Sequence, residues 1–152
     1  MNVQEFLKES GVKCEVIPHE QAYTAQEVAA AEHVSGHNFA KTVIVKGGDE
    51  VVMLVLPASR HVDFKKVAAL LGAKAEMLGE EEMKKIFPDC EIGAESPFGS
   101  QYGVKTFVDE SLREADHIVF RAGTHDETVK ISYADYEKLE EPTGARFAAE
   151  AE

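Results

Sequence analysis

Two apolar runs separated by a glycine-rich turn constrain the fold of this chain most strongly. Residues 42–45 and 51–56 are rich in β-branched side chains and flank Gly47, Gly48 and Asp49. This pattern predicts a β-hairpin, because glycine and aspartate adopt the backbone angles of tight turns. Neither run alternates apolar with polar residues, so we expect the hairpin at the centre of a sheet that is covered on both faces.

Capping residues and helix breakers predict the elements around this hairpin. Thr24 and Glu27 form a capping box that opens an alanine-rich helix ended by Gly36, and Asp63 caps a helix that Gly72 ends. The remaining helices are expected at residues 3–10, 80–87 and 132–139, and the remaining strands at residues 14–17, 75–78, 104–108, 117–120 and 128–131.

The order of these elements mixes strands and helices without strict alternation. It predicts an α/β fold of the mixed α+β kind, in which one domain holds a mixed sheet with surrounding helices. A chain of 152 residues suits one such domain. From residue 140 onward the sequence is polar and rich in alanine, and we expect a frayed tail.

Composition points to a cytoplasmic protein. No apolar run approaches the roughly 20 residues that span a bilayer, and the N-terminus lacks the basic and apolar regions of a secretory signal. Cys14 and Cys90 are far apart and form no C-x-x-C pattern, which favours a reduced, cytosolic chain over a disulfide framework. No membrane partner is expected.

The formal net charge of −12 at first argues against a nucleic-acid partner, because nucleic-acid-binding proteins usually carry a basic footprint. The charge is uneven, however. Residues 1–75 carry 8 Lys/Arg and 9 Asp/Glu, a net of −1, whereas residues 76–152 carry 8 and 19, a net of −11. A site that grips the end of an RNA needs a local basic pocket rather than a basic protein. We therefore expect weak, salt-sensitive RNA binding and no DNA partner.

Three places carry residues suited to chemistry. Lys41 opens the first hairpin strand, where it is either a cation aimed at negative charge or an exposed strand end. The loop at residues 93–103 holds three glycines and a proline, which suits backbone contact with a ligand or a long connection. Residues 123–126 lie between two strands, and His125 there either binds substrate and moves protons or occupies an exposed turn.

Other kinds of site find little support. His33 and His37 have a zinc-like spacing, but Gly36 interrupts it and a third ligand is missing nearby, so we expect no metal. The sequence holds no phosphate-binding glycine loop, nucleophile elbow or Cys–His pair that suggests a nucleophile and its base. No cofactor is expected. His19 follows Pro18 and either lines a cleft or faces solvent.

Taken together and in order, these segments resemble the YbaK/EbsC family of aminoacyl-tRNA editing proteins, which includes the editing insertion domain of bacterial prolyl-tRNA synthetases. The similarity runs from about residue 3 to residue 139, so the editing domain is expected at residues 1–139 and a polar C-terminal tail at residues 140–152. The resemblance implies a barrel-like sheet with one cleft. The matching stretches are HEQAYTAQEVA at 19–29, FAKTVIVK at 39–46, VMLVLP at 52–57, GAESPFG at 93–99 and GTHD at 123–126.

The resemblance also implies roles for individual residues. Lys41 matches a lysine that contacts the RNA end or the substrate, Gly93 a glycine whose backbone helps place the attacking water or the carbonyl, and His125 a histidine that shapes the amino-acid pocket. Glu95 and Phe98 stand where other members have a second glycine and an aliphatic residue, which bears on substrate choice. The expected substrate-binding residues are His19, Tyr23, Thr24, Ser96, Pro97, Gly99, Thr124 and Asp126.

The function implied is hydrolysis of the ester that joins a small, wrong amino acid (alanine, cysteine or serine) to the end of tRNA-Pro or a related tRNA. Such an ester is already activated, so a positioned water suffices without a protein nucleophile. The chain would act as a free-standing enzyme, with a synthetase as a partner in trans. Two alternatives are a non-catalytic module that binds a small molecule or protein, and a hydrolase of another activated ester.

Overall fold

The computed structural model describes residues 3–18, 38–91, 94–123 and 127–150, and the structural statements below refer to these ranges. None of the described helices has the length and apolar character needed to cross a membrane. The helices are α1 (Val3–Glu9), α3 (Phe64–Leu71), α4 (Glu80–Ile86) and α5 (Tyr133–Glu140), with 3-10 turns η1 (Gly99–Tyr102) and η2 (Glu110–Leu112). The strands are β1 (Glu15–Pro18), β2 (Ala40–Gly47), β3 (Glu50–Pro57), β4 (Arg60–Val62), β5 (Ala75–Met77), β6 (Lys105–Asp109), β7 (His117–Arg121), β8 (Glu127–Ser132), β9 (Thr143–Ala145) and β10 (Ala148–Glu150).

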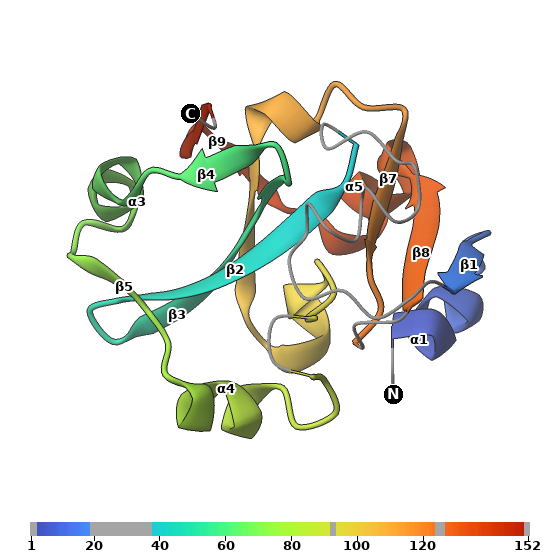
Figure 1. Ribbon diagram of the computed structural model, residues 1–152, viewed down its shortest axis with the longest axis horizontal. Coiled ribbons are helices and arrows are strands. Elements are labelled where there is room, and N and C mark those ends of the chain that lie inside the picture. Colours follow the sequence, from blue (N-terminus) through green and yellow to red (C-terminus); the bar gives the residue numbers. More distant parts are fainter. Residues whose placement is uncertain (1–2, 19–37, 92–93, 124–126, 151–152) are drawn as a thin grey trace.

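The described strands form one mixed sheet and two antiparallel sheets (Figure 1). The mixed sheet has the order β5-β2-β3-β6-β9, with β3–β6 and β6–β9 parallel. The smaller sheets are β1-β8-β7 and the pair β10-β4. An isolated parallel bridge between Phe39 and Val119 links the start of β2 to β7, so the two larger sheets meet there. This arrangement confirms the predicted α/β fold with a mixed sheet and surrounding helices.

The predicted hairpin is present and central, because β2 and β3 both lie inside the five-stranded sheet. Gly48 opens the two-residue loop between the paired Gly47 and Glu50 with φ of 64°, a value that favours glycine. Helix α3 packs closely on the hairpin, since a Cβ added at Gly47 would lie 2.6 Å from Cδ1 of Leu71. Any side chain at Gly47 would therefore require the Leu71 side chain to shift.

Two hydrophobic clusters cover the two faces of this sheet. Ile44 and Met53 belong to the first cluster, which also holds residues of α1, α5, β7 and β8. Val45 and Leu54 belong to the second, which holds Val67 of α3. Because successive side chains of a strand point to opposite faces, Lys41 shares the α3 side of the sheet with Val45.

The capping predictions hold where the structure describes them. The Asp63 carboxylate accepts hydrogen bonds from the backbone N–H groups of Lys65 and Lys66, and Gly72 ends α3 in the left-handed region. The Ser132 hydroxyl accepts a hydrogen bond from the backbone of Asp135 at the start of α5. The helix predicted between Thr24 and Gly36 lies outside the described residues.

The expectation of a frayed tail from residue 140 is wrong for the described part. Strand β9 pairs with β6, and β10 pairs with β4. The Asp109 carboxylate accepts hydrogen bonds from the backbone N–H groups of Phe147 and Ala148, at 3.0 Å each, and the Phe147 side chain is fully buried. Short strand β4 and turn η1, which falls inside the predicted loop 93–103, were also absent from the sequence-based prediction.

Candidate functional site

Two of the predicted functional segments are joined by backbone hydrogen bonds. The Gly123 N–H donates to the Ala94 carbonyl at 2.9 Å, and the Glu91 N–H donates to the Gly123 carbonyl at 2.7 Å. The chain on either side of residues 92–93 is therefore fixed against the residue that precedes positions 124–126. Gly93, Thr124, His125 and Asp126 themselves lie outside the described residues, as do His19, Tyr23, Thr24, His33 and His37.

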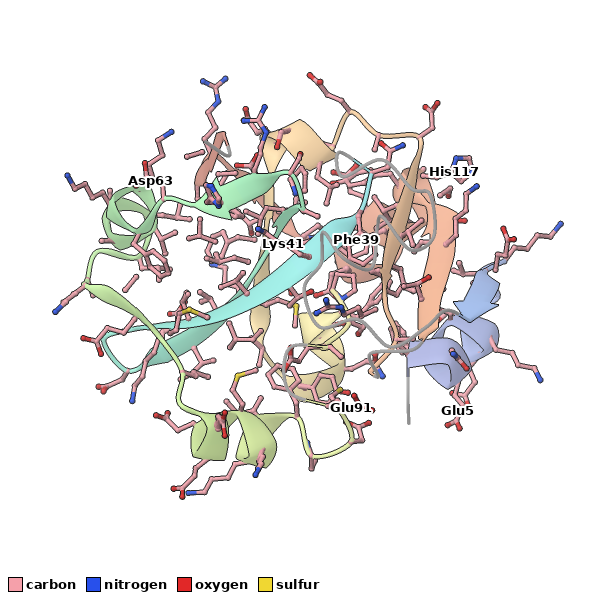
Figure 2. All side chains as sticks on the ribbon, in the orientation of Figure 1. Glu5, Phe39, Lys41, Asp63, Glu91 and His117 are labelled. Carbon is pink, nitrogen blue, oxygen red and sulfur yellow. The ribbon has the colours of Figure 1, made fainter. Side chains whose placement is uncertain are left out.

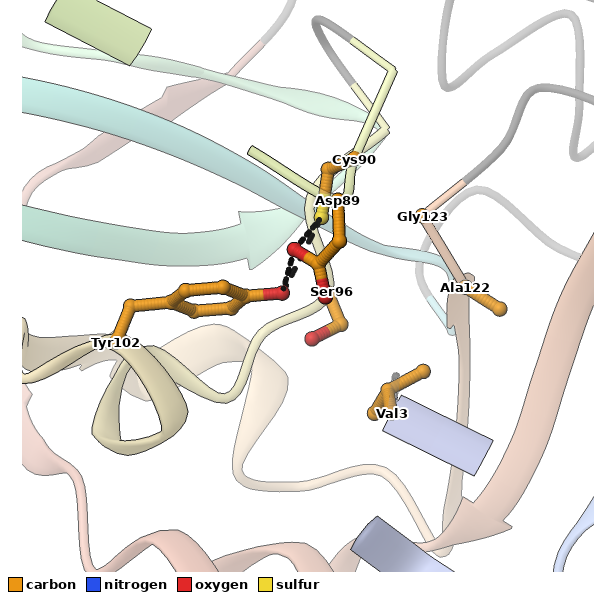
Figure 3. Close-up of a pocket in the computed structure, with 7 residues that line it drawn as sticks. All are labelled: Val3, Asp89, Cys90, Ser96, Tyr102, Ala122 and Gly123. Atoms are coloured by element: carbon orange, nitrogen blue, oxygen red, sulfur yellow. Dashed lines mark hydrogen bonds between the residues drawn. The ribbon is translucent and has the colours of Figure 1, made fainter. Parts of the chain in front are cut away.

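A small pocket lies where these segments meet (Figure 3). Its volume of about 10 Å³ is close to the space that one water molecule requires. Ser96, a predicted substrate-binding residue, and Gly123, from the Gly-Thr-His-Asp segment, are both in its wall. The full lining from the described residues is Val3, Asp89, Cys90, Ser96, Tyr102, Ala122 and Gly123.

One wall of the pocket is a polar cluster of Asp89, Cys90 and Tyr102. The Tyr102 hydroxyl donates to Oδ1 of Asp89 at 2.8 Å, and Sγ of Cys90 lies 3.3 Å from the same hydroxyl (Figure 3). Burial raises the pKa of Cys90 to about 11, and it also raises the pKa of Tyr102 above its ordinary value. At neutral pH both groups are therefore protonated. Since the thiolate is the nucleophilic form of cysteine, Cys90 is not suited to attack a substrate.

Lys41 is the second residue of β2 (Figure 2). It lies opposite Leu56 of β3, and its side chain is half-buried. Loss of solvent around the ammonium lowers the pKa of Lys41 below its ordinary value. A cation that is poorly solvated gains more from a bound anion than an exposed one does. The position therefore suits contact with phosphate or with developing negative charge.

Strand β7 connects the neighbourhood of Lys41 to the small pocket beside Ser96 and Gly123. It bridges to Phe39 at Val119, four residues before Gly123, and the Val119 N–H donates to the Asn38 carbonyl at 3.1 Å. Lys41 thus lies two residues from the junction between the two larger sheets, and β7 runs from this junction to the pocket. The pocket residues Val3, Cys90 and Tyr102 belong to the first cluster, on the other face of the five-stranded sheet from α3. Lys41 is directed to the α3 side of the five-stranded sheet.

The three described substrate-binding candidates in the loop 93–103 occupy different environments. Ser96 faces the pocket. The Pro97 carbonyl accepts a hydrogen bond from the Tyr136 hydroxyl at 2.9 Å inside the core. Gly99 is buried against β6, where an added Cβ would lie 2.6 Å from the Val104 carbonyl oxygen. Packing therefore explains the residue type at Gly99, and substrate contact by Pro97 and Gly99 stays a prediction.

The two residues expected to bear on substrate choice are both buried. Phe98 is fully buried in the first cluster, with its ring centroid 5.2 Å from that of Tyr136 and 5.7 Å from that of Phe120. Its side chain is thus part of the core and is absent from the described pocket wall, and its effect on substrate choice stays a prediction. Glu95 is 4% exposed. Among the described residues, no group of three or more His, Cys, Asp or Glu side chains is arranged to hold a metal ion.

Sequence reasoning missed five of the described residues of the pocket wall, including Ala122, which directly precedes the predicted segment 123–126. Tyr102 lies inside the predicted loop 93–103, so its position was a usable signal. Asp89 and Cys90 follow the proline that ends α4, and Val3 comes from the first turn of α1. These three belong to no motif, because their proximity depends on how α1, the α4 end and β7 pack together.

A buried carboxylate anchors the far end of the loop 93–103. Glu140 at the end of α5 accepts hydrogen bonds from the Ser100 N–H at 3.1 Å, the Ser100 hydroxyl at 2.5 Å and the Thr106 hydroxyl at 2.6 Å. It is 9% exposed, and desolvation by burial raises its pKa even though these hydrogen bonds lower it. Glu140 thereby connects η1 of the loop to α5 and β6.

We expect Glu140→Gln to remove part of the pH dependence of stability. A carboxyl group with a raised pKa binds protons more strongly in the folded state. The contribution of the protonated Glu140 to the free energy of unfolding is fully present below its ordinary pKa of 4.5, and it is lost as pH rises through the folded-state pKa. Urea unfolding between pH 4 and pH 8 should show this decline in the wild type and a flatter curve in Glu140→Gln. Glu141→Gln, an exposed neighbour, is the control, and equal curves for all three proteins would contradict the expectation.

The sequence of this chain is similar to those of several known proteins. A family model described as the aminoacyl-tRNA editing domain matches residues 19–139. The multifunctional Ser/Thr-tRNA deacylase ProXp-y of Escherichia coli strain K12 is 26% identical over 148 residues, which cover 93% of this chain and 88% of that protein. The prolyl-tRNA editing protein ProX of Acetoanaerobium sticklandii is 22% identical over 149 residues, with 94% and 91% covered. A proline–tRNA ligase of Brachyspira hyodysenteriae is 30% identical over 98 residues, which are 63% of this chain and 17% of the ligase.

Solved structures agree with the fold. A crystal structure described as a proposed trans-editing enzyme for prolyl-tRNA synthetase superposes with a TM-score of 0.84 at 20% identity, covering 97% of this chain and 94% of that one. The crystal structure of hypothetical protein APE2540 gives a TM-score of 0.86 at 19% identity, with 97% and 99% covered. At these identities the likeness concerns the fold.

Proposed function

We propose that this chain, which belongs to the aminoacyl-tRNA editing domain family, is a free-standing cytoplasmic deacylase that removes a small, wrongly attached amino acid from tRNA. The family model spans residues 19–139 and therefore most of the domain. Two relatives named for deacylation or editing have nearly the same length as this chain, whereas the matched ligase is several times longer. The likeness to nearly the whole of these two relatives supports action in trans, after a synthetase has released its product.

The pairing of the two loops is the observation that carries the proposal. Hydrogen bonds between Glu91, Ala94 and Gly123 fix the chain next to Gly93 against the chain next to His125. In the proposed site the Gly93 backbone places the attacking water or the carbonyl, and His125 shapes the amino-acid pocket. Lys41 contacts the RNA end or the ester from the adjoining sheet junction.

The proposed chemistry needs no protein nucleophile. An aminoacyl ester is already activated, and the neighbouring ribose hydroxyl and the free amine assist attack by water. The protonated thiol of Cys90 is in keeping with such a route. Orientation of the water and stabilisation of the developing oxyanion each contribute several kcal/mol to catalysis. Lys41, as a half-buried cation, would supply part of the second effect.

The small size of the pocket supports a small substrate side chain. Space for about one water beside Ser96 and Gly123 matches the methyl group of alanine, and the hydroxymethyl group of serine and the sulfanylmethyl group of cysteine are the next larger candidates. A larger side chain is then rejected by steric clash, which discriminates more strongly than the loss of a single methylene contact. We propose tRNA-Pro or a related tRNA as the carrier. Threonine is larger than this pocket favours, and it enters the test below because one relative is named a Ser/Thr-tRNA deacylase.

Release of amino acid from a panel of charged tRNAs tests the function directly. The panel holds alanine, serine, cysteine and threonine on tRNA-Pro, serine and threonine on non-cognate tRNAs, and correctly charged tRNAs as controls. We expect turnover of at least one mischarged tRNA while prolyl-tRNA-Pro is spared. The same assay with an added synthetase detects a partner in trans. Absence of turnover with every substrate, at low salt and excess protein, would instead favour a non-catalytic binding module.

A further inference from the structure

Strand β4 and helix α3 lie in a basic stretch of an acidic chain. Residues 51–75 hold four Lys/Arg and one Asp, a net of +3, whereas the whole chain has a net of −12. The single acid, Asp63, is engaged with the backbone of Lys65 and Lys66. Lys65 and Lys66 are exposed, and so is the nearby His61.

Lys65 and Lys66 occupy a place where cations are unfavourable for the helix itself. They lie in the first turn of α3, and this turn carries no acidic residue. The N-terminal end of a helix has partial positive charge, so lysines there reduce rather than increase helix stability. Residues that go against the sequence preferences of their helix or strand, without stabilising the fold in another way, are expected at functional surfaces. An anion bound by these lysines would also benefit from the helix end.

An exposed aromatic side chain accompanies the two lysines. Phe64, the first residue of α3, is 39% exposed although it is large and apolar. Aromatic faces beside cations are typical of nucleic-acid-binding surfaces, where bases or sugars pack on the ring and phosphates pair with the cations. Among the described residues, three acids lie on or next to these elements: Asp63 caps the helix, Glu150 is in register with Arg60 across β10 and β4, and Glu76 pairs with Lys74 at 3.6 Å.

This surface lies on the same side of the five-stranded sheet as Lys41. Val67 of α3 packs in the second cluster with Leu56, and Leu56 lies opposite Lys41. The chain also links the surroundings of Lys41 to α3. The Ala58 N–H donates to the Phe39 carbonyl at 2.8 Å, and from Ala58 the chain continues through β4 into α3. Figure 2 shows Lys41 on β2 and Asp63 where α3 begins.

We propose that the β4–α3 surface, formed by Arg60, His61, Phe64, Lys65 and Lys66, binds the phosphate backbone of the tRNA acceptor stem while Lys41 engages the aminoacylated end. This inference rests on the proposed deacylase function and names the surface through which an acidic protein holds its RNA. The remaining surface, with its excess of Asp and Glu, repels the rest of the tRNA and directs binding to this side.

The test compares two doubly substituted proteins that change charge equally. Lys65→Glu/Lys66→Glu alters the proposed surface, and Lys84→Glu/Lys85→Glu alters two adjacent exposed lysines in the last turn of α4. Affinity for uncharged tRNA is measured at several salt concentrations. We expect Lys65→Glu/Lys66→Glu to bind at least tenfold more weakly and to lower the salt slope by about 2, about 1 for each lost phosphate contact. The α4 variant should remain within about threefold of the wild type.

Hydrolysis of two substrates separates this surface from the proposed reaction. Lys65→Glu/Lys66→Glu should lose tenfold or more in kcat/KM on mischarged tRNA and stay within twofold of the wild type on the aminoacyl ester of adenosine, which lacks the stem. If the wild type binds tRNA through Lys65 and Lys66 but hydrolyses neither ester, the proposed deacylase function is wrong and the proposed tRNA-binding surface is supported. If the wild type and Lys65→Glu/Lys66→Glu have equal tRNA affinity and equal salt slope, the proposal that this surface binds tRNA is wrong.

Discussion

Lys41→Met is expected to lower kcat/KM for the mischarged tRNA by about 100-fold or more, because loss of one group that stabilises the developing charge costs that much in other hydrolases. Methionine keeps the unbranched stem that lies half-buried on β2 and removes the charge. Stability should not fall, since the substitution removes a cation whose pKa burial already lowers. Single-turnover release of amino acid, with circular dichroism to confirm folding, measures the effect.

Lys46→Met provides a matched control for this substitution. Lys46 lies on the same strand, and its side chain is 43% exposed beside Glu82, at an N–O distance of 4.0 Å. Removal of an exposed ion pair of this kind changes stability by less than about 1 kcal/mol. Lys46→Met should therefore retain wild-type activity. Lys41→Arg retains the charge and should recover part of the rate. Wild-type activity in Lys41→Met would exclude the proposed role of Lys41.

The second large effect is expected at Asp109, which anchors the C-terminal strand. Its Oδ1 accepts hydrogen bonds from the N–H groups of Phe147 and Ala148, and its Oδ2 accepts from the N–H and hydroxyl of Ser111. Hydrogen bonds to a charged group contribute about 1.5–3 kcal/mol each, and buried donors without partners are costly. Asp109→Ala should lower the free energy of unfolding by about 3–4 kcal/mol in urea titrations.

The charge of Asp109 predicts a pH dependence that Asp109→Asn tests. Burial alone would raise the pKa of this carboxyl group, but the hydrogen bonds from Ser111, Phe147 and Ala148 outweigh burial and hold the pKa below its ordinary value of 3.8. The stabilisation is therefore present above pH 3.8 and is lost as pH falls through the folded-state pKa. Asp109→Asn should be less stable than the wild type at pH 7, and the difference should shrink in acid.

An exposed aspartate serves as the control for both substitutions. Asp116 is exposed at the turn before β7, so Asp116→Asn should leave the unfolding free energy within about 0.5 kcal/mol of the wild type. If Asp109→Ala unfolded at the wild-type urea concentration, the strands β9 and β10 would be held by something other than this carboxylate. A difference between Asp109→Asn and the wild type that did not change with pH would contradict the role of its charge.

The candidate site was only partly predictable from sequence. Loops with glycine, proline and histidine were recognised as functional candidates because their residue types are unusual, and the described parts of two such loops do meet. Ser96 lies in the pocket wall and its substrate contact stays a prediction, whereas the Phe98 side chain is part of the core. Sequence spacing gives no information about which side chain of an irregular loop points inward, because such a loop has no fixed period.

The sequence by itself determined the elements whose causes are local. The central hairpin follows from two apolar runs around Gly48, and the ends of α3 follow from Asp63 and Gly72, since turn and capping preferences act between residues a few positions apart. Only the tertiary structure decided that Asp89, Cys90 and Tyr102 line one pocket with Val3, and that Glu140 and the strands after it are held in place. Those contacts join residues tens of positions apart, and they depend on the packing of the sheets rather than on any local pattern.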